Sequence, residues 1–287
     1  MLGQEWGGDD VLPDVPASLA HLQGVLMSLA PPTTVLMYHA VSDNAGACAG
    51  ADPHYAVNRA QFSRHLETVR SAEGTPASVL SLLQRPNQAA VAFTFDDGHE
   101  SNAWAAEALH RVGGAGDFFV NSSTIGAPHQ LSWSALRDMA DSGMSIQSHG
   151  HQHRFLDELT PAEVEGELVI SKRILEDKLG RAVELFAPPG GRAPANLYAV
   201  ATRLGYVAVC SSRVGLWRNR ARSDVPRLAV FDTTSDAQLL KWVRQDYWEL
   251  LNRRIRYRVL TSGKRILGNA SYERVRRILL RQASTGR

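Results

Sequence analysis

The chain has 287 residues, of which 44% are hydrophobic and 21% are charged, and its formal net charge is +2. This length and composition suffice for a catalytic domain with a substantial core, and the sequence contains no long low-complexity tract and no internal repeat. Two cysteines, Cys48 and Cys210, do not indicate a disulfide framework, and we expect both to be free thiols.

The N-terminal residues give little support for export. No Lys or Arg precedes Arg59, so the basic region that opens a signal peptide is missing. Residues 22–30 are apolar but too few to span a bilayer, and Pro31-Pro32 ends the stretch. We therefore expect an N-terminal extension over residues 1–32. We expect a cytoplasmic location, either free or at the inner face of the membrane.

Strand candidates alternate with helical stretches along the rest of the chain. Strands are expected at 34–39, 90–95, 116–121, 144–148, 183–187, 206–210 and 226–231. Helices are expected at 60–71, 102–112, 134–142, 162–179 and 195–204. The fourth helix has a capping box in Thr160 and Glu163, and Gly180 follows its last turn. Such alternation predicts an α/β fold with a parallel sheet.

Two polar motifs follow predicted strands. Thr94-Phe95-Asp96-Asp97-Gly98 ends the second strand, and His149-Gly150-His151-Gln152-His153 follows the fourth. Taken alone, Asp-Asp-Gly is ordinarily a turn, and His-x-x-x-His is often a solvated helix face. Here both motifs lie where β/α folds place their active sites. One carboxylate and two imidazoles can hold a divalent cation with open positions, and the second carboxylate stays free to act as a base.

The two motifs resemble those of the polysaccharide deacetylases, the family 4 carbohydrate esterases. The resemblance extends from about Val35 to about Val230. Its further segments are Val35-Leu36-Met37-Tyr38-His39, Gly116-Asp117-Phe118-Phe119-Val120, Leu131-Ser132-Trp133, Ile146-Gln147-Ser148-His149, Phe186-Ala187-Pro188-Pro189-Gly190-Gly191 and Pro226-Arg227-Leu228. It implies a distorted barrel of the (β/α)7 type with a catalytic domain over residues 33–235.

The resemblance also implies roles for four residues. In that family the first Asp of the pair is the general base, and the second binds the metal together with the two histidines. Asp96 is therefore the expected base, and Asp97, His149 and His153 are the expected metal ligands. His151 falls between the ligand positions, and we expect it to point elsewhere.

The sequence departs from the usual family pattern in two places. Ala187 stands where an arginine normally orients the base, and no late Leu-His motif follows to supply the general acid. The early Tyr-His pair is similar to a branch that acts on poly-N-acetylglucosamine, which makes His39 the expected acid. Arg227 is a candidate for orienting Asp96. The oxyanion donor is expected to be the backbone N–H of Gly190 or Gly191.

Five other histidines lack a partner motif, and surface or capping roles are the default expectation for each. These are His21, His54, His65, His110 and His129.

The implied activity is metal-dependent removal of N-acetyl groups from N-acetylated amino sugars in polysaccharide or glycolipid biosynthesis. The substrate would be an oligosaccharide or a lipid-linked or nucleotide-linked sugar. Zn²⁺ is the expected metal, although Co²⁺, Ni²⁺ and Fe²⁺ suit the same donors. An O-acetyl esterase or a deformylase on the same scaffold is one alternative, and a catalytically inactive carbohydrate-binding protein is another.

The charge of the chain is concentrated at its C-terminal end. Residues 241–287 contain 13 Lys/Arg and 3 Asp/Glu, a net charge of +10, which leaves a net charge of −8 for residues 1–240. Trp242, Tyr247 and Trp248 interleave with arginines here, a pattern that suits peripheral contact with an anionic membrane through residues 241–287. A helix packed on the barrel with solvated arginines is an equal alternative. No nucleic-acid-binding motif is present, so we expect a basic, mainly helical extension over residues 236–287 and no nucleic-acid partner.

Overall fold

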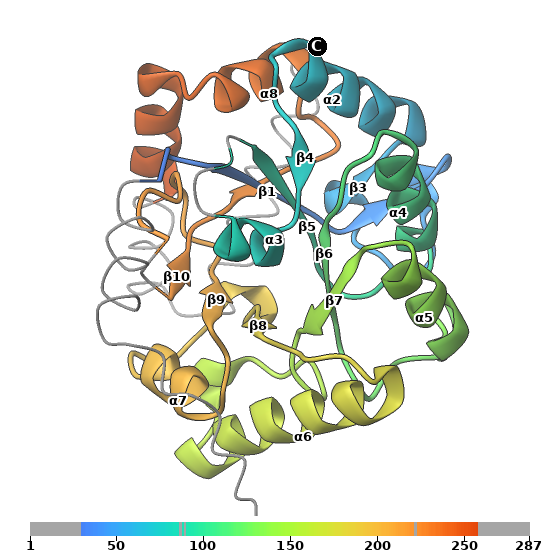
Figure 1. Ribbon diagram of the computed structural model, residues 1–287, viewed down its shortest axis with the longest axis vertical. Coiled ribbons are helices and arrows are strands. Elements are labelled where there is room, and N and C mark those ends of the chain that lie inside the picture. Colours follow the sequence, from blue (N-terminus) through green and yellow to red (C-terminus); the bar gives the residue numbers. More distant parts are fainter. Residues whose placement is uncertain (1–29, 86–87, 89, 221–222, 258–287) are drawn as a thin grey trace, which may run out of the picture.

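A curled parallel sheet surrounded by helices forms the centre of the protein (Figure 1). The computed structural model describes residues 30–85, 88, 90–220 and 223–257. The predicted N-terminal extension, residues 1–32, therefore lies outside the described residues except for Ala30, Pro31 and Pro32, and His21 lies outside them as well. Of the basic extension, residues 236–257 are described.

Within the described residues the sheet has nine strands, and every pair of neighbouring strands is parallel. Its order is β10-β9-β8-β7-β6-β5-β1-β11, with β4 beside β5. The strands are β1 (Thr34–Tyr38), β4 (Pro76–Ala77), β5 (Val91–Phe95), β6 (Asp117–Val120), β7 (Ser145–Ser148), β8 (Leu185–Phe186), β9 (Ala208–Cys210), β10 (Asp224–Val225) and β11 (Leu228–Ala229). Because the last strand returns to the first, the sheet curls into a half-barrel, and the predicted α/β barrel fold is confirmed.

Helices surround the curled sheet, except for α3, which lies within the ring of strands (Figure 1). They are α2 (Arg59–Ser71), α3 (Val79–Gln84), α4 (Asn102–Arg111), α5 (Trp133–Asp141), α6 (Pro161–Leu179), α7 (Leu197–Arg203) and α8 (Asp236–Val243), and residues 247–257 are helical too. At α6 the predicted capping box of Thr160 and Glu163 is formed, and Gly180 ends the helix with a φ of 63°. No helix within the described ranges is long and apolar enough to cross a lipid bilayer.

Every predicted strand and helix is present, and its bounds differ from the prediction by no more than two residues at either end. The strands and α-helices not predicted are short: β4, β10, α3 and the separate parallel pair β2 (Ala40–Val41) and β3 (Ala56–Val57). Helix α8 lies in the extension that was expected to be mainly helical. A two-residue strand is too short to show an alternating pattern by itself, and the runs predicted for the equally short β8 and β11, 183–187 and 226–231, extend beyond both ends of each strand.

Alternation along the strands divides the apolar residues between two cores. Leu36 and Phe118 belong to the larger core, between the sheet and the helices, whereas Val35 and Phe119 belong to a smaller second cluster. Trp242 of α8 is fully buried in the larger core, and its carbonyl accepts a hydrogen bond from Thr34 Oγ1 (2.7 Å). Helix α8 therefore packs against the start of the first strand.

Candidate metal centre and active site

Asp97, His149 and His153 converge at the carboxyl ends of β5 and β7. Each histidine places its Nε2 atom 3.2 Å from the same oxygen, Asp97 Oδ1. The three donor atoms all lie within 4.8 Å of one another. In a tetrahedral shell with metal–ligand bonds of about 2.1 Å, neighbouring ligand atoms are about 3.4 Å apart. The spacing of this trio therefore fits a divalent cation bound by one carboxylate and two imidazoles.

The surrounding backbone orients the three side chains for this purpose. His149 Nδ1 lies 2.8 Å from the carbonyl oxygen of Ala187, so in the neutral ring Nδ1 carries the proton and the Nε2 lone pair faces the trio. Asp97 and His153 adopt positive φ angles of 72° and 58°. Such left-handed conformations cost non-glycine residues on the order of 1–3 kcal/mol and cluster at functional sites. The Gln130 side-chain amide, turned so that both its atoms find partners, donates to the carbonyl of Asp97 (2.8 Å).

The pKa values of Asp97 and His149 agree with a tight charge cluster. Burial acts to raise the pKa of Asp97, but hydrogen bonds from His149 and His153 hold it well below its usual value. Burial acts to lower the pKa of His149, yet its bond to Asp97 and the charge of Asp96 raise it overall. A cation that binds here replaces this proton, because a ligating imidazole must be deprotonated.

Asp96 is not part of the trio and forms a buried ion pair with Arg227. The guanidinium donates to both carboxylate oxygens, at 2.7 and 2.8 Å. Asp96 is 3% exposed and Arg227 is 1% exposed. Burial acts to raise the pKa of Asp96, but the charge of Arg227 lowers it overall. The expected contact between these residues is therefore present, and Arg227 supplies the arginine that the chain lacks at Ala187.

His39 follows β1 directly, beside the end of β5. Its ring packs on Tyr55 with centroids 4.4 Å apart, and its carbonyl accepts a hydrogen bond from Asn102 Nδ2 (2.9 Å). Its Nδ1 atom is buried and has no hydrogen-bond partner. Burial lowers the pKa of His39, and the charges of Asp97 and Asp96 only partly oppose this. His39 therefore lies within electrostatic reach of both carboxylates and is neutral at pH 7.

The segment after β8 contributes backbone groups to the site. Gly190 and Gly191 have positive φ angles of 60° and 64°, and a Cβ atom on Gly190 would lie 2.7 Å from the ring of Phe155. The Gly191 N–H already donates to the carbonyl of Pro188 (2.9 Å). The Gly190 N–H has no acceptor within the described part of the chain. Of the two expected oxyanion donors, only Gly190 keeps its N–H available.

His151 turns away from the metal trio, as expected, and its Nδ1 lies 2.9 Å from Ser122 Oγ. The sequence did not single out Glu167, which is 5% exposed and accepts hydrogen bonds from the backbone N–H groups of His151 and Gln152. One signal was available. An acidic residue stands in the buried stripe of α6, whose positions are Val164, Glu167, Leu168, Ser171 and Leu175.

The default expectation of a surface or capping role is wrong for His65. Its side chain is fully buried, with Nδ1 3.0 Å from Tyr38 Oη and Nε2 3.3 Å from the carbonyl of Thr234. His54 and His129 are partly exposed and pair with Asp232 and Glu100. His110 is exposed and bonds the carbonyl of Ser142, near the end of α5.

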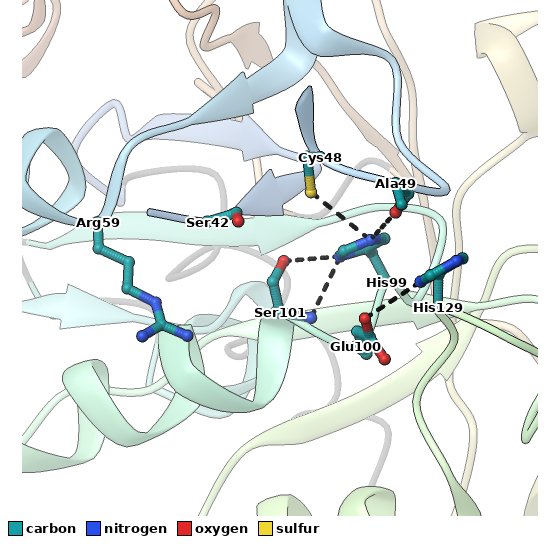
Figure 2. A pocket seen from close by; sticks show the side chains of 8 residues that line it. All are labelled: Ser42, Cys48, Ala49, Arg59, His99, Glu100, Ser101 and His129. Atoms are coloured by element: carbon teal, nitrogen blue, oxygen red, sulfur yellow. Dashed lines mark hydrogen bonds and ion pairs between the residues drawn. The ribbon is translucent and has the colours of Figure 1, made fainter. Parts of the chain in front are cut away.

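A pocket of about 510 Å³ lies beside the Asp97 turn (Figure 2). His99 forms part of its wall, with Nε2 2.9 Å from the carbonyl of Ala49 and Nδ1 accepting from the Ser101 N–H. Both ring nitrogens are thus engaged, so His99 holds two loops together and is not available as a ligand. Cys48, in the same wall, and Cys210 are free thiols, as expected.

Comparison with known proteins adds a family to this geometry. Residues 84–209 match the family model described as polysaccharide deacetylase. A curated relative, YxkH of Bacillus subtilis (strain 168), is 27% identical over 179 residues. That match covers 60% of this chain and 61% of YxkH, so less than two thirds of the relative's length is represented.

Solved structures share the fold. A polysaccharide deacetylase from Bacillus cereus has a TM-score of 0.67 at 23% identity, covering 75% of this chain and 69% of that chain. The Streptococcus pyogenes deacetylase PplD, solved with acetate, has a TM-score of 0.66 at 23% identity, covering 75% and 99%. IcaB from Ammonifex degensii has a TM-score of 0.64 at 21% identity, covering 75% and 97%. The family match places a polysaccharide deacetylase domain over residues 84–209, and the solved structures share the (β/α)7-type barrel fold.

Proposed function

We propose that the chain is a metal-dependent hydrolase that removes N-acetyl groups from N-acetylated amino sugars. Its family implies a hydrolase acting on acetylated sugars. One observation carries the finer assignment: two adjacent carboxylates have separate partners. Asp97 faces two imidazoles, whereas Asp96 is held by Arg227. This division is what a metal ligand and a neighbouring general base require.

Asp96 acts as the base. Its low pKa keeps it ionised at neutral pH, and the bidentate contact with Arg227 fixes the direction of its oxygens. A divalent cation held by Asp97, His149 and His153, with Zn²⁺ as the first choice and Co²⁺, Ni²⁺ or Fe²⁺ suiting the same donors, would polarise the acetyl carbonyl and lower the pKa of a water molecule. Asp96 would take a proton from this water molecule while the water oxygen forms its bond to the acetyl carbon. The Gly190 N–H would donate to the carbonyl oxygen as charge develops on it.

The leaving side of the reaction needs a proton. When the amide C–N bond breaks, acetate and a free amine form, and the amine nitrogen must be protonated as it leaves. His39 is the donor that we assign to this step. Because burial lowers its pKa, His39 is neutral at rest and must first gain a proton. The proton that Asp96 removes from water can supply His39, so this proton comes from within the site.

Two features favour this assignment over its alternatives. An amine is a poorer leaving group than an alcohol, so the placement of His39 supports an amide substrate over the O-acetyl ester of an esterase. A deformylase would use the same centre and differs only in the acyl group. A carbohydrate-binding protein without activity would not need an ionised Asp96 whose two oxygens are both oriented by Arg227. We place the substrate among oligosaccharides and lipid-linked or nucleotide-linked amino sugars of polysaccharide or glycolipid biosynthesis.

Acetate release from a substrate panel tests the proposal. The panel contains N-acetylglucosamine oligomers, lipid-linked N-acetyl sugars and acetylated xylan. We expect release from the N-acetyl substrates and a fall of roughly 10²–10⁴-fold in Asp96→Asn and in His39→Ala. Arg203→Met, a surface change, is the control that keeps wild-type activity. Unchanged release in Asp96→Asn would refute the base assignment, and activity confined to acetylated xylan would overturn the amide assignment.

Peripheral contact with an anionic membrane is a separate part of the proposal. Tyr247 is 67% exposed, Trp248 is 69% exposed and Ile255 is 51% exposed, all on the helix of residues 247–257. Arg254 and Arg256 are exposed on the same helix. Exposed aromatic side chains beside cations are what an interfacial helix presents to acidic headgroups. The remaining residues of the basic extension, 258–287, lie outside the described residues.

A further inference from the structure

Helix α6 holds the turn that carries the two histidines of the metal trio. Glu167 Oε2 accepts hydrogen bonds from the His151 N–H (2.7 Å) and the Gln152 N–H (2.8 Å). One helical turn later, Ser171 Oγ lies 2.8 Å from Ser148 Oγ, just before the turn begins. Two side chains of one helix thus contact the chain on both sides of His149, at Ser148 before it and at His151 and Gln152 after it.

The turn needs such support because its two histidines are fixed very differently. His149 continues the ladder of β7, since its N–H donates to the carbonyl of Val120 (2.9 Å), and its ring is bonded to the Ala187 carbonyl. The His153 side chain is 41% exposed, and among the described residues its ion-pair partner is Asp97. The position of His153 relative to His149 therefore depends on the backbone of residues 150–152. Glu167 bonds two of the three N–H groups in that stretch.

The close approach of the Glu167 carboxylate to the turn also requires a glycine at position 150. Gly150 has a φ of 86°, and a Cβ atom there would lie 3.1 Å from Glu167 Oε2. Glu167 is 5% exposed, so its charge is taken out of water and stabilised by the N–H groups of the turn. An apolar residue would fit the buried stripe of α6 at lower desolvation cost, yet it would remove the acceptor that the His151 and Gln152 N–H groups share. The role of a buried carboxylate at this position is therefore to bond the backbone of the turn and not to add to the apolar core.

We propose that Glu167 is a positioning residue for the metal centre. Its carboxylate fixes the backbone of His151 and Gln152 and thereby sets the distance between the two imidazoles that bind the cation. The inference rests on the metal centre of the proposed function, although it does not depend on the acyl group or the sugar. Groups that orient metal ligands through a second layer of hydrogen bonds typically contribute 10- to 100-fold to metal affinity or activity.

Zinc affinity and amide exchange in Glu167 variants test this role. Glu167→Ala removes both acceptor bonds, and Glu167→Gln keeps one neutral acceptor. Glu165→Gln is the matched control, because Glu165 lies on the same helix, changes charge equally and pairs only with Arg203 at the surface. The zinc dissociation constant is measured by calorimetry on chelator-stripped full-length protein. Hydrogen exchange of the His151 and Gln152 amides is followed in the metal-free state.

We expect Glu167→Ala to weaken zinc binding by roughly 10- to 100-fold, with Glu167→Gln intermediate and Glu165→Gln within twofold of wild type. The two amides should exchange faster in Glu167→Ala without metal. A purely structural role would lower thermal stability alike with and without zinc, leaving the dissociation constant unchanged. That result, or unprotected amides in the wild type, would overturn the inference. Weak zinc binding in Glu167→Ala with no acetate release by the wild type would support the inference and refute the proposed activity, whereas a wild type that binds no metal would overturn both.

Discussion

Replacing Arg227 with Met should destabilise the fold far more than replacing an equivalent arginine at the surface. Arg227 holds Asp96 through two bonds of 2.7 and 2.8 Å, and the two residues are 1% and 3% exposed. Removing one partner of a buried pair leaves an uncompensated charge and costs about 3–5 kcal/mol. Arg203 forms a similar two-bond pair with Glu165, at 3.1 and 2.9 Å, but these side chains are 58% and 43% exposed. Exposed pairs contribute about 0.2–1 kcal/mol.

Urea unfolding at pH 7, followed by circular dichroism, measures the two free-energy changes. We expect Arg227→Met to lose at least about 2 kcal/mol more than Arg203→Met, because the two pairs differ mainly in burial. The double variant Asp96→Asn/Arg227→Met should recover part of the loss, since it removes the unpaired charge. A loss in Arg227→Met equal to that in Arg203→Met would refute the reasoning. So would a double variant that is less stable than Arg227→Met.

Two further predictions concern pH and membranes. Burial lowers the pKa of His65 from 6.5 to about 4, so between these values the unfolded chain binds more protons and stability falls with falling pH, by about 2 kcal/mol from pH 7 to pH 5. In His65→Gln the urea-derived stability should lose this pH-dependent part, and an unchanged slope would show that His65 is not its source. Binding to anionic vesicles in a sedimentation assay should weaken in the double variant Tyr247→Ala/Trp248→Ala and at high salt. Val207→Ala, at a position 47% exposed, is the control, and equal binding by both proteins would exclude this surface.

The metal trio was accessible from the sequence because its determinants are local. Asp96-Asp97-Gly98 directly follows one strand, and the five-residue His motif directly follows another. Each motif can therefore be located from the residues next to it. Parallel strands then bring both ends to one edge of the sheet. The bounds of β5 are set by a largely apolar run that is visible without the structure, whereas β7, Ser-Ile-Gln-Ser, contains a single apolar residue and is a weaker strand signal.

The residues that support the trio were harder to find because their contacts span the chain. Arg227 and Asp96 are separated by 131 positions, and Glu167 lies 16 positions from the His151 N–H that it bonds. Neither partner shows a spacing that identifies the other. Arg227 could be proposed because the sequence lacks the arginine that normally orients the base. No missing residue of this kind pointed to Glu167. His65 was misjudged for a related reason, since Tyr38 and Thr234 approach it from distant segments.

The separate environments of Asp96 and Asp97 follow from the backbone at the end of β5. Side chains alternate along a strand, so Thr94 and Asp96 share one face, and Arg227 Nη1 bonds both of them, at 3.2 and 2.7 Å. Asp97 leaves the strand with a φ of 72°, which turns its carboxylate to the two histidines of the loop after β7. Two neighbouring carboxylates with the same intrinsic pKa thus acquire different partners from one change in backbone direction. The Asp-Asp-Gly turn, the ordinary structural reading of these three residues, is therefore also the cause of the chemistry that we assign to them.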